Sequence, residues 1–150
     1  MKLAVVFNAN KFSGRLTRLF TGCFAYHVAW VDEQAGLMYD MHLIRRRRLW
    51  PRYEGSQVVL FDIPEVTREH LEDQLTRDGS TYGWIDYILF SLRPIYHLFG
   101  QSTRNANGVI CSEMVNDDMR ACGREAFGAA GDPPPSPCDL YRWLRTKGIA

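Results

Sequence analysis

The chain has 150 residues, of which 46% are hydrophobic and 23% are charged, and its formal net charge is +1. This length predicts a single domain, residues 1–150, that is able to bury a sizeable core. The composition excludes a disordered chain, which needs low hydrophobicity and high net charge, and the charge balance excludes a globally basic protein that coats nucleic acid. The basic residues are nevertheless uneven, with one block at Arg45, Arg46, Arg47 and Arg48.

The four cysteines have no metal-knuckle spacing and are too few for a disulfide-built miniature scaffold; they are Cys23, Cys111, Cys122 and Cys138. An apolar run at residues 3–7 is too short for the core of a secretory signal, so it predicts a buried strand. No stretch reaches the roughly 20 apolar residues of a membrane span. We therefore expect a soluble protein, cytoplasmic or virion-associated, without a signal peptide and with free thiols.

Strand patterns occupy the first half of the chain, at residues 3–7, 26–31, 37–43 and 58–61, with a short helical spacing at 13–20. The strands at 26–31 and 37–43 surround a short turn and predict a hairpin. In the register that pairs Asp32 with Leu37, Ala29 faces Asp40 and His27 faces His42.

Helical patterns occupy the second half, at residues 64–76, 87–92 and 111–122 and from about residue 139, and residues 132–137 form a polyproline tract. Strands first and helices later predict an α+β fold in one domain.

Cys111 stands where a turn enters a helix, and this position suits a nucleophile. Free N–H groups and the helix dipole stabilise a thiolate there, and the same N–H groups can hold an oxyanion. The hairpin offers His27 as the base, with Asp40 or His42 to orient its ring. Cys111 also belongs to the apolar stripe of its helix, so simple core packing is the alternative.

Four segments resemble motifs of one family. Residues 109–115 resemble an "aromatic/aliphatic–Cys–Ser–Glu–Leu–Val" nucleophile helix, and residues 26–31 resemble a "Ser–His–Val–Gly–Ile–Val" strand. Residues 79–84 are similar to "Gly-x-x-Tyr-x-Trp", and residues 135–141 to "Thr–Pro–Gly–Asp–Leu–Tyr". In this order, with the histidine before the cysteine, they resemble the permuted NlpC-like cysteine hydrolases, the YiiX-like branch of the papain-type amidases. Ala29 and Cys138 depart from glycines of the family pattern.

This resemblance implies a papain-like core, in which a small antiparallel sheet or open barrel carries the histidine and packs against helices. It assigns the nucleophile to Cys111 and the general base to His27. The third polar residue falls on Asp40, with His42 as the alternative, and Tyr82 matches a tyrosine that lines the oxyanion site. No cofactor is implied.

The expected function is that of a thiol hydrolase acting on an amide or ester, with cell-wall peptides as the family's best-understood substrates. The compact chain resembles versions carried by bacteriophages and prophages. Two alternatives stay open: a lipid esterase or acyltransferase of the same superfamily, and a non-catalytic binding or virion component that keeps the fold. The non-catalytic alternative predicts that His27 lies far from Cys111, with no third residue behind the ring.

The arginine block allows two interpretations. A charged edge that discourages strand pairing is one, and contact with an anionic substrate group through Arg45, Arg46, Arg47 and Arg48 is the other. We expect no nucleic-acid partner, although such a contact would show steep salt dependence. A zinc site of His27, His42 and Cys111 fits no familiar ligand spacing, so no metal is expected. The oligomeric state is left open.

Overall fold

The computed structural model of the chain describes residues 1–8, 15, 18–19, 22–41, 45–53, 55–77, 111–129, 132 and 134–149. The helical patterns at 13–20 and 87–92 lie largely or wholly outside the described residues. No helix in the described ranges is long and apolar enough to cross a membrane.

An antiparallel sheet of five strands forms one layer of the molecule, in the order β4-β3-β2-β1-β5. Its strands are β1 (Lys2–Phe7), β2 (Ala25–Asp32), β3 (Leu37–Met41), β4 (Arg45–Leu49) and β5 (Gln57–Asp62). The central strands β1 and β2 are buried over most of their length, because their near-continuous apolar runs can face a core on both sides. The predicted strands at 3–7, 26–31, 37–43 and 58–61 all correspond to strands of this sheet.

The hairpin of β2 and β3 has the predicted register. Asp32 pairs with Leu37, Val31 with Met38, and Trp30 with Tyr39. Among the described residues the ladder between these strands ends at this third pair, although β2 begins five residues earlier, at Ala25. The described ladder with β3 therefore does not include the first half of β2.

The arginine block forms β4, a strand that apolar periodicity does not reveal. It pairs with β3 from Leu37–Leu49 to Met41–Arg45 and lies at the edge of the sheet. Charged side chains on an edge strand oppose pairing with a further strand. The arginine block, which was expected to form a charged edge, is thus itself the edge strand of the sheet.

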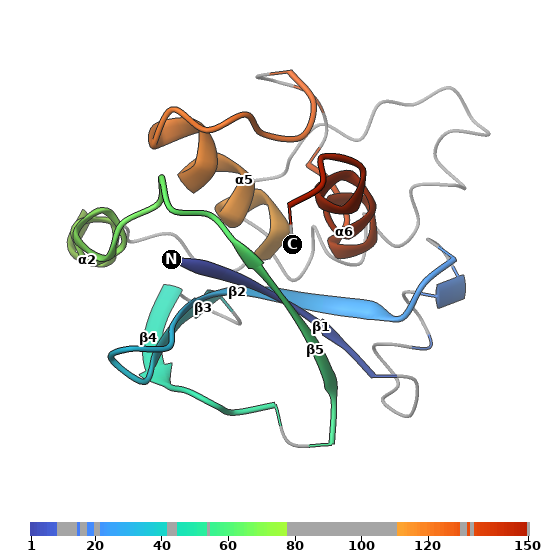
Figure 1. Cartoon of the computed structure of the whole chain (residues 1–150), viewed down its shortest axis with the longest axis horizontal. Coiled ribbons are helices and arrows are strands. Elements are labelled where there is room, and N and C mark those ends of the chain that lie inside the picture. Colours follow the sequence, from blue (N-terminus) through green and yellow to red (C-terminus); the bar gives the residue numbers. More distant parts are fainter. Residues whose placement is uncertain are drawn as a thin grey trace.

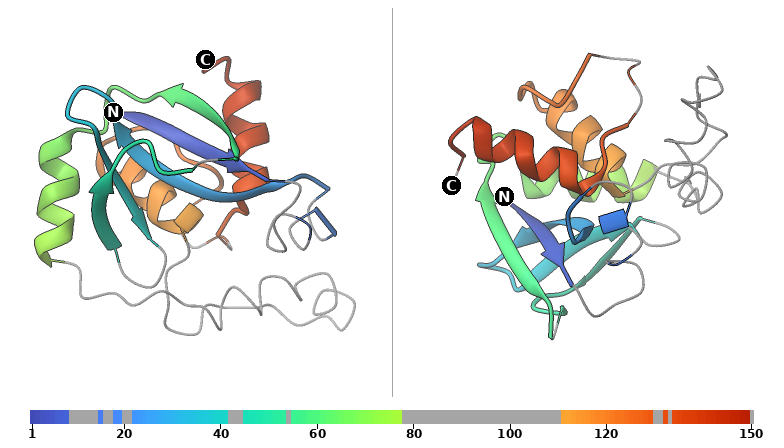
Figure 2. Two further views of the ribbon diagram at one scale, coloured as in Figure 1. Left: turned by 90° about the horizontal axis from the view of Figure 1, so that it is seen from below. Right: turned by 90° about the vertical axis from the view of Figure 1, so that its right-hand side faces the viewer.

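Three helices are described, α2 (Arg68–Arg77), α5 (Cys111–Ala121) and α6 (Pro137–Thr146). They lie on the same side of the sheet and form the second layer of an α+β fold (Figures 1 and 2). Helix α2 begins later than its pattern suggested, because Thr67 Oγ1 accepts a hydrogen bond from the backbone N–H of His70 and caps it. Ser136 and Asp139 form a capping box at the start of α6.

Both faces of the sheet are covered. The main core lies between the sheet and the helices and includes Trp30, Met114 and Leu140. A smaller core on the opposite face includes Ala29 and Met38 and packs against side chains from the β4–β5 connection, which crosses beneath the sheet in Figure 1. Polar side chains on this second face of β2 and β3 are therefore shielded from water.

Candidate active site

Cys111 is the first residue of α5, and its side chain is buried and not disulfide-bonded. Its sulfur accepts hydrogen bonds from the backbone N–H groups of Val28 and Ser112. The first N–H groups of a helix lack partners within the helix, and they can stabilise a negatively charged sulfur there. The turn into a helix thus places the thiol where a thiolate is favoured.

The position of α5 explains how a helix residue reaches a strand residue. Helix α5 packs against β2, and Val28 lies in the part of β2 beyond the described β2–β3 ladder. There the Val28 N–H donates to the Cys111 sulfur. The helix N-terminus therefore meets β2 where the described pairing with β3 has ended.

His27 and Asp40 lie together on β2 and β3. Nε2 of His27 is 3.8 Å from Oδ2 of Asp40, and the two side chains are 5% and 0% exposed. This is the geometry expected from the hairpin, in which Asp40 falls diagonally opposite His27 on the same face. The structure thus brings together Cys111, His27 and Asp40 from three separate elements.

The pKa values of the histidine and the thiol are coupled. Burial alone would lower the pKa of His27, but the charge of Cys111 and the neighbouring carboxylate of Asp40 outweigh burial and raise this pKa to about 9. Burial would likewise raise the pKa of Cys111, yet the positive charge of His27 and the hydrogen bonds to the sulfur lower it. These opposite shifts favour a thiolate paired with an imidazolium.

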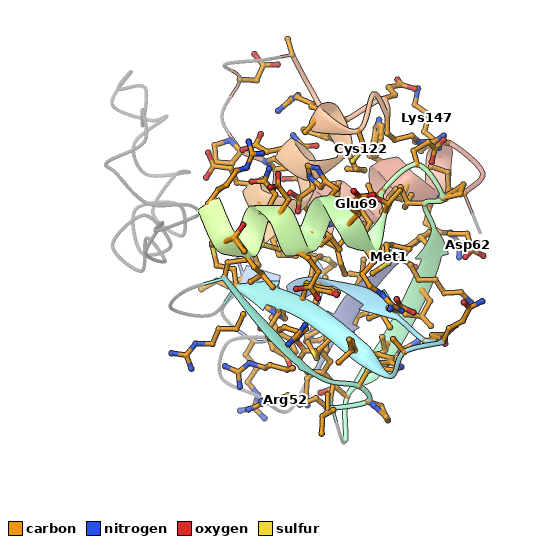
Figure 3. The ribbon with its side chains drawn as sticks, turned by 90° about the vertical axis from the view of Figure 1, so that its left-hand side faces the viewer. Met1, Arg52, Asp62, Glu69, Cys122 and Lys147 are labelled. Carbon is orange, nitrogen blue, oxygen red and sulfur yellow. A yellow bond between two sulfur atoms is a disulfide. The ribbon has the colours of Figure 1, made fainter. Side chains whose placement is uncertain are left out.

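The other free thiol provides a contrast. Cys122 follows the end of α5 and is half-buried in the helix layer (Figure 3). Burial raises the pKa of Cys122. One thiol, at the start of α5, is therefore held toward the thiolate form, and the other, just after the end of α5, is held in the neutral form.

Two sequence candidates lie outside the described residues. They are His42, the alternative third residue, and Tyr82, the expected oxyanion-site residue. Asp40 faces His27 in the described part of the structure, and a role for Tyr82 stays a prediction.

The arginines of β4 face acidic side chains of the chain itself. Arg45 Nη1 lies 3.0 Å from Asp118 of α5, Arg47 Nη1 lies 2.9 Å from Glu72 of α2, and Arg48 Nε lies 3.3 Å from Asp40. Alternation along the strand explains this division, because residues 45 and 47 face the helix layer while residue 48 faces the second core. Arg46 is exposed, and contact of the block with an anionic substrate stays a prediction.

Asp118 forms a buried polar cluster that sequence patterns did not reveal. Its carboxylate accepts hydrogen bonds from Trp30 Nε1 at 2.9 Å and Arg45 Nη1 at 3.0 Å, and it lies 3.2 Å from His70 Nε2. The available signal was an acidic residue seven positions after Cys111, on the inward face of an amphipathic helix. The cluster ties α5 to β2, β4 and α2.

The expectation that all thiols are free is wrong in this structure. Cys23, before β2, and Cys138, at the start of α6, form a disulfide across 115 residues of sequence. Spacing along the chain could not reveal this pair, because the two cysteines meet only after α6 has packed on β2. Cys138, which replaces the glycine of the family pattern, is fully buried.

A groove of about 940 Å³ lies at the opposite end of the described sheet, between β2, β5 and α2. Met1, Asp62 and Glu69 line it and are labelled in Figure 3. None of Cys111, His27 and Asp40 lines this groove. In the described part of the chain, no three His, Cys, Asp or Glu side chains are grouped to hold a metal ion.

No protein-family model, no curated protein and no solved structure matches this chain.

Proposed function

We propose that the chain is a cysteine-dependent hydrolase with a papain-like, permuted NlpC-type arrangement, in which Cys111, His27 and Asp40 form the catalytic triad. The observation that carries the proposal is the convergence of three buried ionisable side chains, with Asp40 Oδ2 3.8 Å from His27 Nε2 and the thiol at a helix N-terminus. Buried polar groups destabilise a fold unless they are paired, and strongly perturbed pKa values concentrate at functional sites.

The acylation step begins from the thiolate–imidazolium pair. The Cys111 sulfur attacks the carbonyl carbon of an amide or ester, and backbone N–H groups at the start of α5 stabilise the oxyanion. The tetrahedral intermediate collapses as the bond to the leaving group breaks, and His27 donates its proton to that group. A thioester with Cys111 and a neutral His27 result.

Deacylation restores the enzyme. His27 accepts a proton from a water molecule, whose oxygen attacks the thioester carbonyl. The carbon–sulfur bond breaks, the carboxylic acid leaves, and Cys111 returns as a thiolate beside the imidazolium. Asp40 stabilises the imidazolium in both steps and keeps its own charge.

The substrate class proposed first is a peptide amide such as those of bacterial cell walls, in accordance with the motif resemblance. An acyl thioester or lipid ester is the alternative that shares the same chemistry. Purified muropeptides and short-chain thioesters, tested side by side, separate the two. Hydrolysis of muropeptides supports the amide substrate, and turnover of thioesters alone would move the proposal to acyl substrates.

The activated thiol can be tested without a substrate. At neutral pH we expect iodoacetamide to label Cys111 faster than Cys122, and Cys111→Ala to abolish this fast labelling while circular dichroism stays unchanged. Cys122→Ala, just after the end of the same helix, is the matched control and should keep the fast labelling. Equal labelling of the two thiols in the unaltered protein would contradict the proposal.

A further inference from the structure

The carboxylate of Asp40 has a neighbour at each of its oxygens. Oδ2 faces His27 and accepts a hydrogen bond from the Tyr53 hydroxyl at 3.4 Å, while Oδ1 lies 3.3 Å from Nε of Arg48. Asp40 itself is fully buried. A buried carboxylate thus lies among a cation, a hydroxyl donor and an imidazole.

Tyr53 contacts both members of the pair that it adjoins. Its ring centroid lies 5.6 Å from that of His27, with the planes tilted by 57°, and its hydroxyl reaches Asp40. Burial, followed by the charge of Asp40, raises the pKa of Tyr53, so the hydroxyl stays protonated and remains a donor. Tyr53 comes from the β4–β5 connection, which otherwise serves as the cover of the second core.

Arg48 balances the charge of Asp40. Its side chain is 21% exposed, so the guanidinium remains partly hydrated while its Nε approaches the buried carboxylate. An isolated buried charge is strongly unfavourable, and a partner cation reduces that penalty. Arg48 can therefore offset the cost of a charged Asp40 inside the core.

We propose that Tyr53 and Arg48 are positioning residues of the site, which hold the Asp40 carboxylate so that Oδ2 faces the His27 ring. The terminal torsion of an aspartate is broad, so a carboxylate with no neighbours samples many orientations. A contact at each oxygen removes that freedom and holds Oδ2 toward His27 Nε2. The catalytic meaning of this inference rests on the proposed function.

Tyr53→Phe is the sharpest test, because it removes one oxygen atom and keeps the ring on His27. The charged and titratable groups described next to His27 are Cys111 from α5, Asp40 from β3, Tyr53 from the connection and Tyr26 of β2, whose ring centroid lies 6.5 Å from that of His27. If Asp40 turns away from His27, it stabilises the imidazolium less. The titration midpoint of His27 should then fall by about one pH unit, which is a tenfold change in proton affinity. The midpoint is measured by ¹⁵N NMR of the ring. An unchanged or raised midpoint would overturn the proposal for Tyr53.

Arg48→Lys keeps the positive charge but removes the guanidinium, whose Nε lies 3.3 Å from Asp40 Oδ1, so we again expect the His27 midpoint to fall. Arg47→Gln is the matched control on the same strand, because Arg47 pairs with Glu72 on the exposed surface and should leave the midpoint unchanged. Circular dichroism checks that each variant is folded. An Arg48→Lys midpoint equal to that of the unaltered protein, or an equal fall in Arg47→Gln, would overturn the role of Arg48.

These titrations need no substrate, so the two proposals can fail separately. If the variants shift the His27 titration midpoint but the protein hydrolyses no substrate, the proposed hydrolase function is contradicted and the positioning of Asp40 is supported. Hydrolysis that depends on Cys111, with midpoints unaffected by Tyr53→Phe and Arg48→Lys, would contradict the positioning alone.

Discussion

At the scale of single residues, Cys111 and His27 stabilise each other's charged form inside a buried site. Neither group would ionise readily there alone, because burial penalises each charged form. Asp40 adds a second negative charge next to the imidazole, and the N–H groups at the start of α5 add donors to the sulfur. The reactivity of the thiol is thus a property of the cluster and not of the cysteine alone.

The pH dependence of alkylation checks this reasoning. Because the pKa of Cys111 is lowered and that of Cys122 is raised, the rate of Cys111 with iodoacetamide should rise less steeply between pH 7 and 8.5 than the rate of Cys122, which should rise about tenfold per pH unit. In His27→Asn the Cys111 profile should shift upward in pH, toward that of Cys122. Parallel profiles for the two thiols in the unaltered protein would contradict the ion pair.

Hydrolysis should respond to pH differently from alkylation. As pH rises through about 9, His27 loses its proton and can no longer protonate the leaving group, so turnover of an amide substrate should fall. The thiolate persists, so alkylation of Cys111 should not fall in the same range. Steady-state rates and alkylation rates measured across pH 7–10 in the same buffers make this comparison.

At the scale of secondary-structure elements, the position of α5 depends on a polar cluster as well as on apolar packing. Asp118 lies two turns after Cys111 and connects α5 to Trp30 of β2, Arg45 of β4 and His70 of α2. A strand of arginines can belong to the sheet because its neighbours supply carboxylates on both faces. Three of the four arginines of β4 therefore form ion pairs with described residues of the chain itself.

Asp118→Asn should lower the free energy of unfolding by about 3 kcal/mol, because it leaves Arg45, whose side chain is 7% exposed, without its buried counter-charge. Asp117→Asn is the matched control, since Asp117 is 59% exposed and pairs with Arg120 at the surface. Its effect should be below about 0.5 kcal/mol. Urea denaturation of the two variants provides the measurement, and equal losses would contradict a special role for the buried cluster.

At the scale of the whole molecule, the Cys23–Cys138 disulfide links the segment before β2 to the start of α6. It joins two parts of the chain on either side of the catalytic elements. A cross-link restricts the unfolded chain more as the enclosed loop lengthens. This bond therefore closes residues 23–138 into one loop.

Reduction of this disulfide should lower the free energy of unfolding by about 4 kcal/mol, given the 115-residue separation of its cysteines. The measurement is chemical denaturation with and without a phosphine reductant. Cys23→Ser with Cys138→Ser is the control, and its stability should not depend on the reductant. Thiol titration of the unreduced, denatured protein should count only Cys111 and Cys122, and four reactive thiols would contradict the bond.

Local patterns were sufficient for the β2–β3 hairpin, its register and the helix that begins at Cys111. Period-two alternation places His27 and Asp40 on one face, and a turn before an amphipathic helix places a thiol at free N–H groups. These features depend on neighbours close in sequence, so they can be read along the chain. The same alternation puts His42 on that face too and does not decide between His42 and Asp40; of the two, only Asp40 lies in the described structure, where it contacts His27.

Contacts between distant segments were decided only in three dimensions. The arginines of β4 meet Asp40, Glu72 and Asp118 because strand order and side-chain direction bring them together, and apolar periodicity encodes neither. Tyr53 reaches Asp40 because the β4–β5 connection crosses the second face of the sheet. Four free thiols were expected, but the structure has two free thiols and one disulfide, because the disulfide joins segments that are distant in the sequence. Pairing across 115 residues depends on how α6 packs on β2, and no local pattern carries that information.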